Sequence, residues 1–279
     1  MRTKVLVIAT AIALLGPVTT VPTLLIAQTP AAAKATDLKT VLFEWANHMG
    51  MLRGVQQVES MATVEYLGTG SINVGGQQCK LTNYRALINY QTPGARIIFA
   101  CTLPNGQTHQ DIHVVSGKYA WNESTVGAGL VPGDGRATPA TDAVNDRLIQ
   151  LWSGPQGAVK AARAGGANTK VAIEGGKTVV TFPIPGVAGA IAKAVLSANY
   201  QAERVETRLG NAVTEFIYSD YADFNDANER LDAFFAGRII EKRGGGTVLD
   251  LTVNRTNTGN LFVIMPVPPN VQKAAPGKS

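Results

Sequence analysis

The stretch RIIEKRGGGTVLDLTVNRT, residues 238–256, predicts the fold class, because it reads as two β-strands joined by a glycine turn. In its second arm, Leu249, Leu251 and Val253 alternate with residues of the other face, the period of a strand that buries one side. The glycines at 244–246 can adopt the positive φ values of a tight strand reversal, so they indicate a turn rather than a phosphate-binding loop. A hairpin of this kind is a structural element without a catalytic motif. The function therefore has to be sought in what a sheet of such hairpins encloses.

Similar strand patterns lie on both sides of a helical region near the middle of the chain. Apolar spacing predicts one helix over 38–53 and a helical insertion over 141–164, and strands punctuated by turns occupy 61–121 and 170–255. No linker separates two complete cores, because the strands before and after the insertion all need partners. We therefore expect a single α+β domain, residues 34–265, built on an antiparallel sheet of about eleven strands with an N-terminal helix and a mid-chain helical insertion.

The two ends of the chain differ from this domain. MRTKVLVIATAIALLG, with basic residues before an unbroken apolar run, has the layout of a secretory signal peptide, so we expect residues 1–33 to be removed by cleavage between Gln28 and Lys34. The alternative is an uncleaved anchor, because residues 5–27 approach the ~20 residues that span a bilayer. We expect an exported, periplasmic protein with no transmembrane segment in the mature chain. At the other end, the composition of residues 266–279 predicts a flexible tail.

The sequence lacks the motifs of the enzyme and cofactor classes that can be recognised by spacing. It has no G-x-S-x-G nucleophile elbow, and the acidic segment 220–228 lacks the glycine of an EF-hand. His109 and His113 have zinc-binding spacing only on a helix, whereas THQDIHVVS reads as a strand, on which they lie about 13 Å apart. Without residues 1–33 the chain keeps 23 basic and 20 acidic residues and no basic run with interleaved aromatics, which argues against a nucleic-acid partner. We expect no cofactor, no metal and no enzymatic activity.

Cys79 and Cys101 are the two cysteines of the chain, and export would bring them into an oxidising compartment, where a disulfide is the natural product. A hairpin turning about Pro93 and Gly94 would place Cys101 near Ala86 and away from Cys79. A bond would then need a bulge or another strand to bring the two Cα atoms within ~4–7 Å. A disulfide and two buried free thiols both stay open.

Five segments resemble proteins of the periplasmic lipoprotein-carrier superfamily. They are VVSGKYAWNES (114–124), RLIQLWSGPQGAVKAA (147–162), YSDYADFND (218–226), GRIIEKRGGGTVLDLTV (237–253) and MPVPPNV (265–271). With the order of helix, meander, insertion and closing hairpins, they look like the LolA, LolB and RseB-like half-barrels, and in particular like exported soil-bacterial proteins described as outer-membrane lipoprotein-sorting homologues. The resemblance implies a curved half-barrel sheet, closed by helices, around an apolar cavity that receives lipoprotein acyl chains in the carriers and serves regulation in the sensors.

Alternation along one strand suggests which side chains would face such a cavity. A sheet that curves around a ligand turns its apolar face inward, and strand 80–90 has one largely apolar face. The alternative is that the same residues form the core beneath the helices. The expected lining, from this strand, from strand 178–184 and from the insertion, is Tyr84, Ala86, Ile88, Tyr90, Trp152, Val180 and Phe182.

The sequence therefore favours a periplasmic, non-enzymatic binding or carrier protein for a lipid, a lipoprotein acyl chain or another apolar ligand. One alternative is an envelope sensor or assembly module that contacts an envelope protein and holds no ligand. Another is an enzyme with no recognisable motif. An open apolar cavity would favour the carrier, and a tight polar cluster with shifted titrating groups would favour the enzyme.

Overall fold

The computed structural model describes residues 37–56, 58–59, 61–130, 135–224, 233–260 and 262–274. The expected signal peptide and its cleavage site lie outside the described residues, as does part of the acidic segment 220–228.

The described strands form one large sheet and two short ladders, and every pairing is antiparallel. The ladders pair β1 (Leu52–Arg53) with β2 (Val58–Glu59) and β14 (Ala222–Asp223) with β15 (Phe234–Phe235). The large sheet holds β3 (Thr63–Val74), β4 (Gln77–Asn89), β5 (Gly94–Thr102), β6 (Thr108–Ser116), β7 (Tyr119–Glu123), β8 (Ala137–Pro139), β9 (Lys170–Glu174), β10 (Lys177–Pro183), β11 (Ile191–Leu196), β12 (Ala202–Leu209), β13 (Ala212–Ser219), β16 (Arg238–Arg243) and β17 (Gly246–Asn257).

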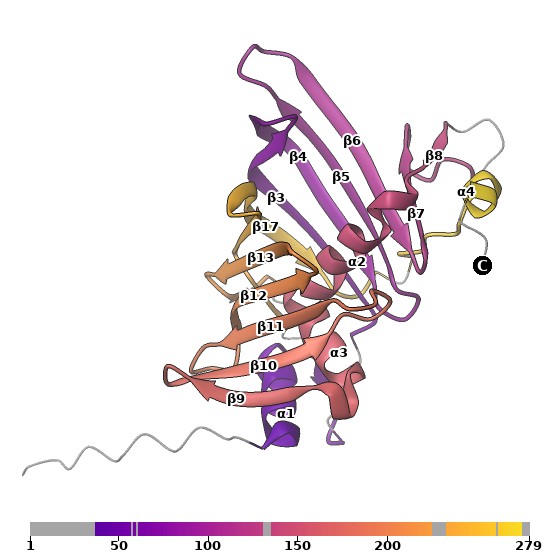
Figure 1. Ribbon diagram of the computed structural model, residues 1–279. Helices are drawn as coiled ribbons and strands as arrows, with labels where there is room; N and C mark the ends of the chain where they lie inside the picture. Colours follow the sequence, from indigo (N-terminus) through magenta and orange to yellow (C-terminus); the bar gives the residue numbers. More distant parts are fainter. Residues whose placement is uncertain are drawn as a thin grey trace, which may run out of the picture. The chain divides into compact units, whose positions relative to one another are not determined.

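The order across the large sheet is β8-β7-β6-β5-β4-β3-β17-β16-β13-β12-β11-β10-β9, which leaves β8 and β9 at the edges of an open sheet. Figure 1 shows that the strand direction turns along this order, so the sheet is curved as in a half-barrel. The structure confirms an α+β protein with one large antiparallel sheet, of thirteen strands among the described residues where about eleven were expected.

The stretch 238–256 forms the β16–β17 hairpin, as predicted. Arg243 pairs with Gly246, so Gly244 and Gly245 make a two-residue turn, in which both have positive φ, 54° and 84°. On its other side β17 pairs with β3. The hairpin therefore joins the strands that precede the helical insertion to those that follow it, within one continuous sheet.

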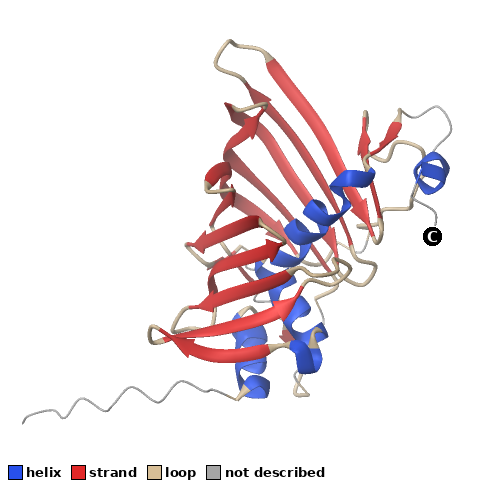
Figure 2. Cartoon of the chain, in the orientation of Figure 1, coloured by secondary structure: helices blue, strands red, loops and turns tan. Residues whose placement is uncertain are grey.

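Three of the described helices pack on one face of this sheet. α1 (Leu38–His48) begins at Asp37, whose carboxylate accepts a hydrogen bond from the Thr40 N–H at 2.9 Å, and it ends at His48, short of the expected residue 53. α2 (Val144–Ser153) and α3 (Pro155–Ala164) form the insertion, and Figure 2 shows α2 lying across the strands. Within the described part of the chain, no helix is long and apolar enough to cross a membrane.

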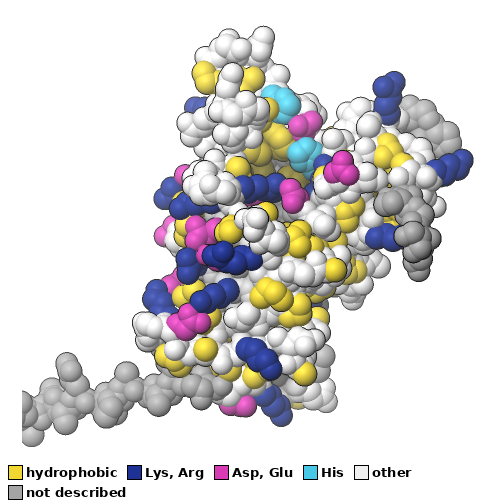
Figure 3. All heavy atoms as spheres, in the orientation of Figure 1, with side chains coloured by type: hydrophobic (Ala, Val, Ile, Leu, Met, Phe, Trp, Pro, Cys, Tyr) yellow, Lys and Arg dark blue, Asp and Glu magenta, His cyan; other side chains and the backbone are white. Residues whose placement is uncertain are grey.

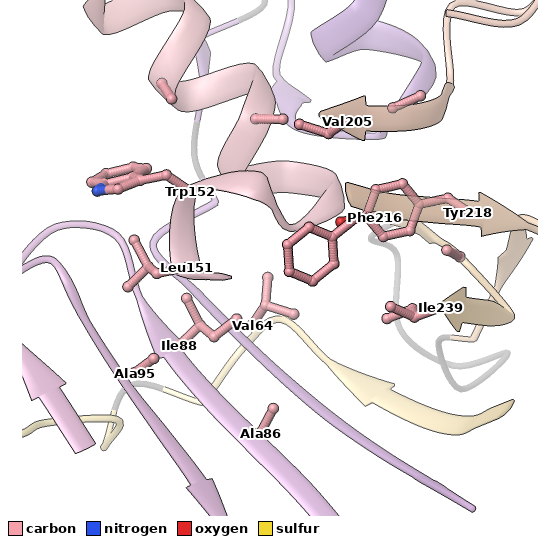
Figure 4. Packing of buried hydrophobic residues seen from close by; sticks show 14 of the residues in the cluster. Val64, Ala86, Ile88, Ala95, Leu151, Trp152, Val205, Phe216, Tyr218 and Ile239 are labelled. Atoms are coloured by element: carbon pink, nitrogen blue, oxygen red, sulfur yellow. The ribbon is translucent and has the colours of Figure 1, made fainter. Parts of the chain in front are cut away.

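The buried apolar side chains divide into two clusters on opposite faces of the sheet. On β5, Ile97 and Phe99 belong to the larger cluster and Ile98 to the smaller one, and successive strand residues point to opposite faces. The larger cluster packs against α1, α2 and α3, and Figure 4 shows part of it, with Leu151 and Trp152 lying close to the sheet.

The chain's own C-terminal segment covers the smaller cluster with Val263, Met265 and Val271. Of residues 266–279, whose composition predicts a tail, Pro269–Ala274 form α4. Asn270 in this helix donates a hydrogen bond from Nδ2 to the Ala137 carbonyl at 2.6 Å, so α4 lies against the β8 edge of the sheet. Residues 275–279 lie outside the described part of the chain.

The register expected for the β4–β5 hairpin is wrong. The Oδ1 atom of Asn89 accepts hydrogen bonds from the N–H groups of Gln91 and Thr92, both at 2.9 Å, so the reversal begins there and not at Pro93. Asn89 consequently pairs with Gly94. The whole of β5 is thus shifted along β4 relative to the sequence-based register.

The shifted register brings the two cysteines together. Cys101 pairs with Leu81, two residues from Cys79, and the pairing also shifts at a bulge between Leu81 and Asn83. Cys79 and Cys101 form a disulfide with their Cα atoms 5.5 Å apart. Of the two open alternatives, the structure therefore has the disulfide, formed across neighbouring strands.

Candidate ligand-binding site

A pocket of about 210 Å³ lies on the helix-bearing face of the sheet and is bordered on one side by Gln150 of α2. In Figure 1 the strands β3 to β6 continue past α2. The apolar lining of the pocket comes from β3, β4, β5 and β17: Ile72, Tyr84, Ile97, Phe99, Val248 and Leu249. Its polar lining comes from β3, β6, α2 and β16: Asn73, His113, Gln150, Glu241 and Arg243. Apolar walls with a few polar groups are typical of small-molecule sites, although this pocket is smaller than the ~300–1,000 Å³ usual for them.

A β-bulge shapes the β17 side of the pocket. Glu241 pairs with Leu249 and Lys242 with Thr247, so Val248 is left without a partner on β16. A bulge of this kind changes where side chains point, and Val248 and Leu249 both line the pocket. On the other side of β17, Leu249 pairs with Ile72 of β3, which extends the apolar wall toward β4.

Two larger depressions, of about 460 and 440 Å³, are poorer candidates. The first is lined by side chains such as Gln78 and Lys80, which are exposed to solvent. The second lies over an exposed ladder of ion pairs that includes Lys193 with Glu174. Neither contains a buried polar group directed at a ligand, so the smaller pocket is the better site.

Glu241 is the buried acid of the pocket, with a residue exposure of 2 %. Its Oε1 accepts a hydrogen bond from Nε of Arg243 at 2.7 Å, and its Oε2 accepts one from Nε2 of Gln150 at 3.2 Å. Arg243 also donates from Nη1 to Asp146 of α2 at 3.1 Å. Burial raises the pKa of Glu241 above its ordinary value, and this effect outweighs the lowering by Arg243, because the Arg243 side chain is 41 % exposed and shares its charge with solvent.

Tyr84 lines the pocket from β4, and its hydroxyl is fully buried. Burial raises the pKa of Tyr84 well above the ordinary range, and the nearby Tyr66 phenol and Glu241 carboxyl add to the rise. Tyr84 therefore stays a protonated phenol, and its ring stacks on that of Tyr66 at 6.1 Å between centroids. It also borders a void of only about 10 Å³ beneath α2 and α3, which is room for a single water at most.

Of the two histidines whose strand spacing argued against a zinc site, His113 lines the pocket and His109 lies four residues before it on the same strand. The expected strand is confirmed as β6, and His109 and His113 both flank the Phe99 ring, at 5.9 and 5.6 Å between centroids. Nε2 of His109 lies 2.8 Å from Asp111 Oδ2 and Nε2 of His113 lies 3.6 Å from it. Figure 3 shows histidine side chains beside hydrophobic ones on the visible face. Among the described residues, no cluster of three or more His, Cys, Asp and Glu side chains could hold a metal ion.

Arg147 fastens α2 to the strands beside these histidines. Its guanidinium donates to the carbonyls of Val114 and Trp121, at 2.9 and 2.7 Å, and to Oδ1 of Asn122 at 2.5 Å. Burial lowers the pKa of Arg147 to about 10, so it remains charged at neutral pH. Burial, followed by the charge of Arg147, in turn lowers the pKa of His113, so this ring is neutral at the edge of the pocket.

The expected lining residues are all buried in the larger hydrophobic cluster, but only one of them lines the pocket. That residue is Tyr84; Ile88 and Tyr90 border the small void instead. Tyr90 packs on Trp152 at 6.0 Å and Phe182 on Trp45 at 6.3 Å between ring centroids. The seven are Tyr84, Ala86, Ile88, Tyr90, Trp152, Val180 and Phe182, and Figure 4 shows Ala86, Ile88 and Trp152 where the sheet faces the helices.

The polar side of the pocket was missed by the sequence reasoning, although a signal for it was present. In RIIEKR, alternation places Ile239, Glu241 and Arg243 on one face of the strand, so an acid follows an apolar residue on the core side. Gln150 had no such signal, because its role depends on how α2 crosses the sheet.

Comparisons with known proteins find similarity at the level of structure alone. No protein-family model and no curated protein sequence matches the chain. Among solved structures, the chain is similar to an outer membrane lipoprotein-sorting protein domain from Vibrio parahaemolyticus, with a TM-score of 0.46 and 10 % identity over 81 % of this chain and 95 % of that one. It is also similar to a LolA superfamily protein from Nitrosomonas europaea, with a TM-score of 0.40 and 10 % identity over 81 % of this chain and 96 % of that one. A DUF1329 family protein from Desulfovibrio piger has a TM-score of 0.38 and 9 % identity over 82 % of this chain and 95 % of that one.

Proposed function

We propose that this chain is an exported, periplasmic binding or carrier protein that holds an apolar or lipid-like molecule and has no enzymatic activity. The observation that carries the proposal is the pocket of about 210 Å³, with Ile97, Phe99 and Leu249 in one wall. Burial of apolar ligand surface against such a wall contributes roughly 25 cal/mol per Å². The pocket lies beyond α2 and not beneath the helices, where the space is filled by the protein's own side chains.

The near absence of free space beneath the helices supports the alternative of an interaction module without a ligand. The void there measures about 10 Å³, far too little for an acyl chain. The two functions differ in a measurable property, because a carrier binds apolar molecules in the pocket and an interaction module does not.

An enzyme would be favoured by a polar cluster with shifted pKa values, and Glu241 meets that description in part. Both of its oxygens, however, already accept hydrogen bonds, from Arg243 and Gln150. A general base must reach the proton that it removes, and both oxygens are here oriented toward donors of the protein itself. The cluster is therefore better suited to holding a polar group than to transferring a proton.

The proposal is tested by titrating the protein with the apolar fluorescent probe N-phenyl-1-naphthylamine. Val248→Trp adds an indole to the pocket wall and is expected to weaken probe binding at least 10-fold. The matched control is Val213→Trp, because Val213 is a half-buried strand valine that does not line this pocket. Absence of probe binding to the unmodified protein, or equal binding by both variants, would contradict the carrier function and favour the interaction module.

A further inference from the structure

Among the described residues, the two edges of the large sheet differ in what lies beside them. An edge strand presents a row of unpaired backbone N–H and C=O groups, to which another strand can add. At the β8 edge lies α4, whose Asn270 donates a hydrogen bond to the Ala137 carbonyl at 2.6 Å. At the other edge, β9 pairs with β10 on one side and with no described strand on the other. Figure 1 shows β9 as the last strand at its end of the sheet.

β9 lacks the proline and the bulge that often keep edge strands apart. Its sequence is KVAIE, its register with β10 runs without a shift over all five residues, and four of the five are exposed. Its two charged residues have opposite signs and stand at opposite ends, Lys170 first and Glu174 last. Charges of one sign would repel a second copy of the strand, whereas this arrangement matches a copy that runs antiparallel.

The turn that follows β9 shows which of its backbone groups point away from the sheet. Glu174 pairs with Lys177 across a two-residue turn, 175–176, whose glycines have positive φ, 54° and 75°. The pair next to such a turn exchanges hydrogen bonds, and such pairs alternate along an antiparallel ladder. Every second residue counted back from Glu174 therefore directs its N–H and C=O to β10. The backbone groups of Val171 and Ile173 point outward, where they offer two donors and two acceptors to a further strand.

One register of two antiparallel copies of β9 satisfies both the backbone groups and the charges. With Ala172 opposite the partner's Ala172, Val171 faces the partner's Ile173, so outward-pointing groups meet outward-pointing groups. Lys170 then lies opposite the partner's Glu174, and the two-fold symmetry forms the same pair a second time. Registers centred on Val171 or Ile173 also bring outward groups together, but they do not place Lys170 opposite a glutamate.

The side chains of β9 agree with such a pairing on both faces. The Glu174 carboxylate accepts a hydrogen bond from Lys193 Nζ at 2.6 Å, in an exposed ion pair that contributes little, and it has a second oxygen for another lysine. Lys170 donates only to the Ala167 carbonyl among the described residues, at 3.2 Å. On the helix-bearing face, Ile173 is 42 % exposed, and a partner strand would cover it.

We propose that the protein forms a homodimer in which β9 pairs antiparallel with β9 of a second copy, about a two-fold axis at Ala172. The two sheets then form one continuous sheet. This inference goes beyond the proposed binding function and does not depend on it. β9 contributes no residue to the pocket of about 210 Å³, and four strands separate it from β16, the nearest pocket strand in the sheet order.

The association is measured by sedimentation velocity of the purified exported protein. Because two five-residue strands bury less than the roughly 1,200 Å² of a standard interface, the dimer is weak, and protein concentrations of about 1–100 µM are needed. The weight-average sedimentation coefficient is expected to rise from the monomer value toward the dimer value over this range.

Exchanging the charges tests the register. Glu174→Lys places lysine opposite lysine in both pairs and should weaken the dimer about 10-fold or more. The double variant Lys170→Glu/Glu174→Lys restores opposite charges in both pairs and should restore dimerisation. The matched control is Glu203→Lys on β12, which removes a similarly exposed ion pair, with Lys177, and should dimerise as the parent does.

A proline tests the backbone pairing separately from the charges. Ile173→Pro removes an outward N–H and none of the bonds to β10, whereas Ile173→Ala keeps that N–H. The proline variant should dimerise about 10-fold more weakly than the alanine variant, because the symmetric interface loses two hydrogen bonds. Thermal unfolding midpoints close to that of the parent establish that each variant is folded.

Four outcomes would overturn the inference. They are a parent that stays monomeric at the highest concentration, a dimer that Glu174→Lys and Glu203→Lys weaken equally, a double exchange variant that remains as weak as Glu174→Lys, and equal dimerisation by Ile173→Pro and Ile173→Ala. A concentration-dependent dimer that is weakened by Glu174→Lys and restored by the double exchange supports it.

Discussion

Loss of the disulfide is expected to destabilise this protein by about 3 kcal/mol. Cys79 and Cys101 are 22 residues apart in sequence, and the entropy of closing a loop of that length corresponds to about 3.4 kcal/mol at 25 °C. This value is an upper limit for the Cys79→Ala/Cys101→Ala variant, because residual structure in the unfolded chain reduces it. In a chain of this size it corresponds to a fall in the midpoint of thermal unfolding of about 7–14 °C.

The assay is urea and thermal unfolding followed by far-ultraviolet circular dichroism, for the oxidised parent, the parent in excess dithiothreitol and the double variant. The reduced parent should unfold close to the double variant, and the reductant should not change the variant. Both cysteines are fully buried, so reduction requires partial opening of the β4–β5 hairpin and should be slow under native conditions. Equal midpoints for oxidised and reduced parent would refute the reasoning, because they would show that no bond restricts the unfolded chain.

Three further perturbations test the packing and the charges. The first is Glu241→Gln. Because the pKa of Glu241 is raised, the folded state binds a proton more tightly than the unfolded state, and the stability that this proton contributes is present below about pH 4.5 and lost as the pH rises through the folded-state pKa. The parent should therefore lose stability relative to the variant between pH 4.5 and 7.5, and a pH-independent difference in urea midpoints would contradict this. The second is Gly157→Ala, which would place a Cβ 2.2 Å from the Leu151 carbonyl oxygen and should lower the free energy of unfolding by about 1–3 kcal/mol despite the better helix propensity of alanine. Gly154→Ala, whose Cβ would lie 3.5 Å from the same oxygen, is the control and should be tolerated. Equal unfolding midpoints for the two variants would show that the α2–α3 contact is not tight. The third is Arg96→Met, which leaves the Glu123 carboxylate buried without its ion-pair partner and should lower the free energy of unfolding in urea by about 3–5 kcal/mol. The double variant Arg96→Met/Glu123→Leu should lose less. A single variant no less stable than the double variant would mean that the pair is not desolvated.

Strand periodicity was sufficient to predict the sheet, because alternation and glycine turns are local signals. The β16–β17 hairpin and the strand that carries His109 and His113 follow from them directly. The β4–β5 register could not be predicted from these local signals. It depends on the hydrogen bonds of Asn89 and on a bulge, each of which shifts the pairing without changing the alternation. The relation of Cys79 to Cys101 was therefore open until the pairing was known.

The site was less predictable than the fold for a related reason. Alternation identifies which residues share a face of a strand, but not how far a helix covers that face. Ile88 and Tyr90 lie where α2 and α3 fill the space, whereas Ile97 and Phe99, farther along the sheet, lie in the pocket. Both pairs have the same sequence pattern. The position of α2 decides between core and pocket, and it depends on contacts such as those of Arg147 with β6 and β7.

The hairpin at 238–256 has two roles that impose different demands on its sequence. As a strand pair it connects the two halves of the sheet, and for that purpose apolar residues on the helix-bearing face would be best. At its turn end it instead supplies Glu241 and Arg243 to the pocket, and a bulge there adds Val248 beside Leu249. An ion pair between buried Glu241 and partly exposed Arg243 adds little net stability, and a bulge interrupts the ladder, so neither feature is explained by the needs of the sheet. Both are explained if this end of the hairpin is the wall of a binding site, where a polar group must be held beside an apolar surface.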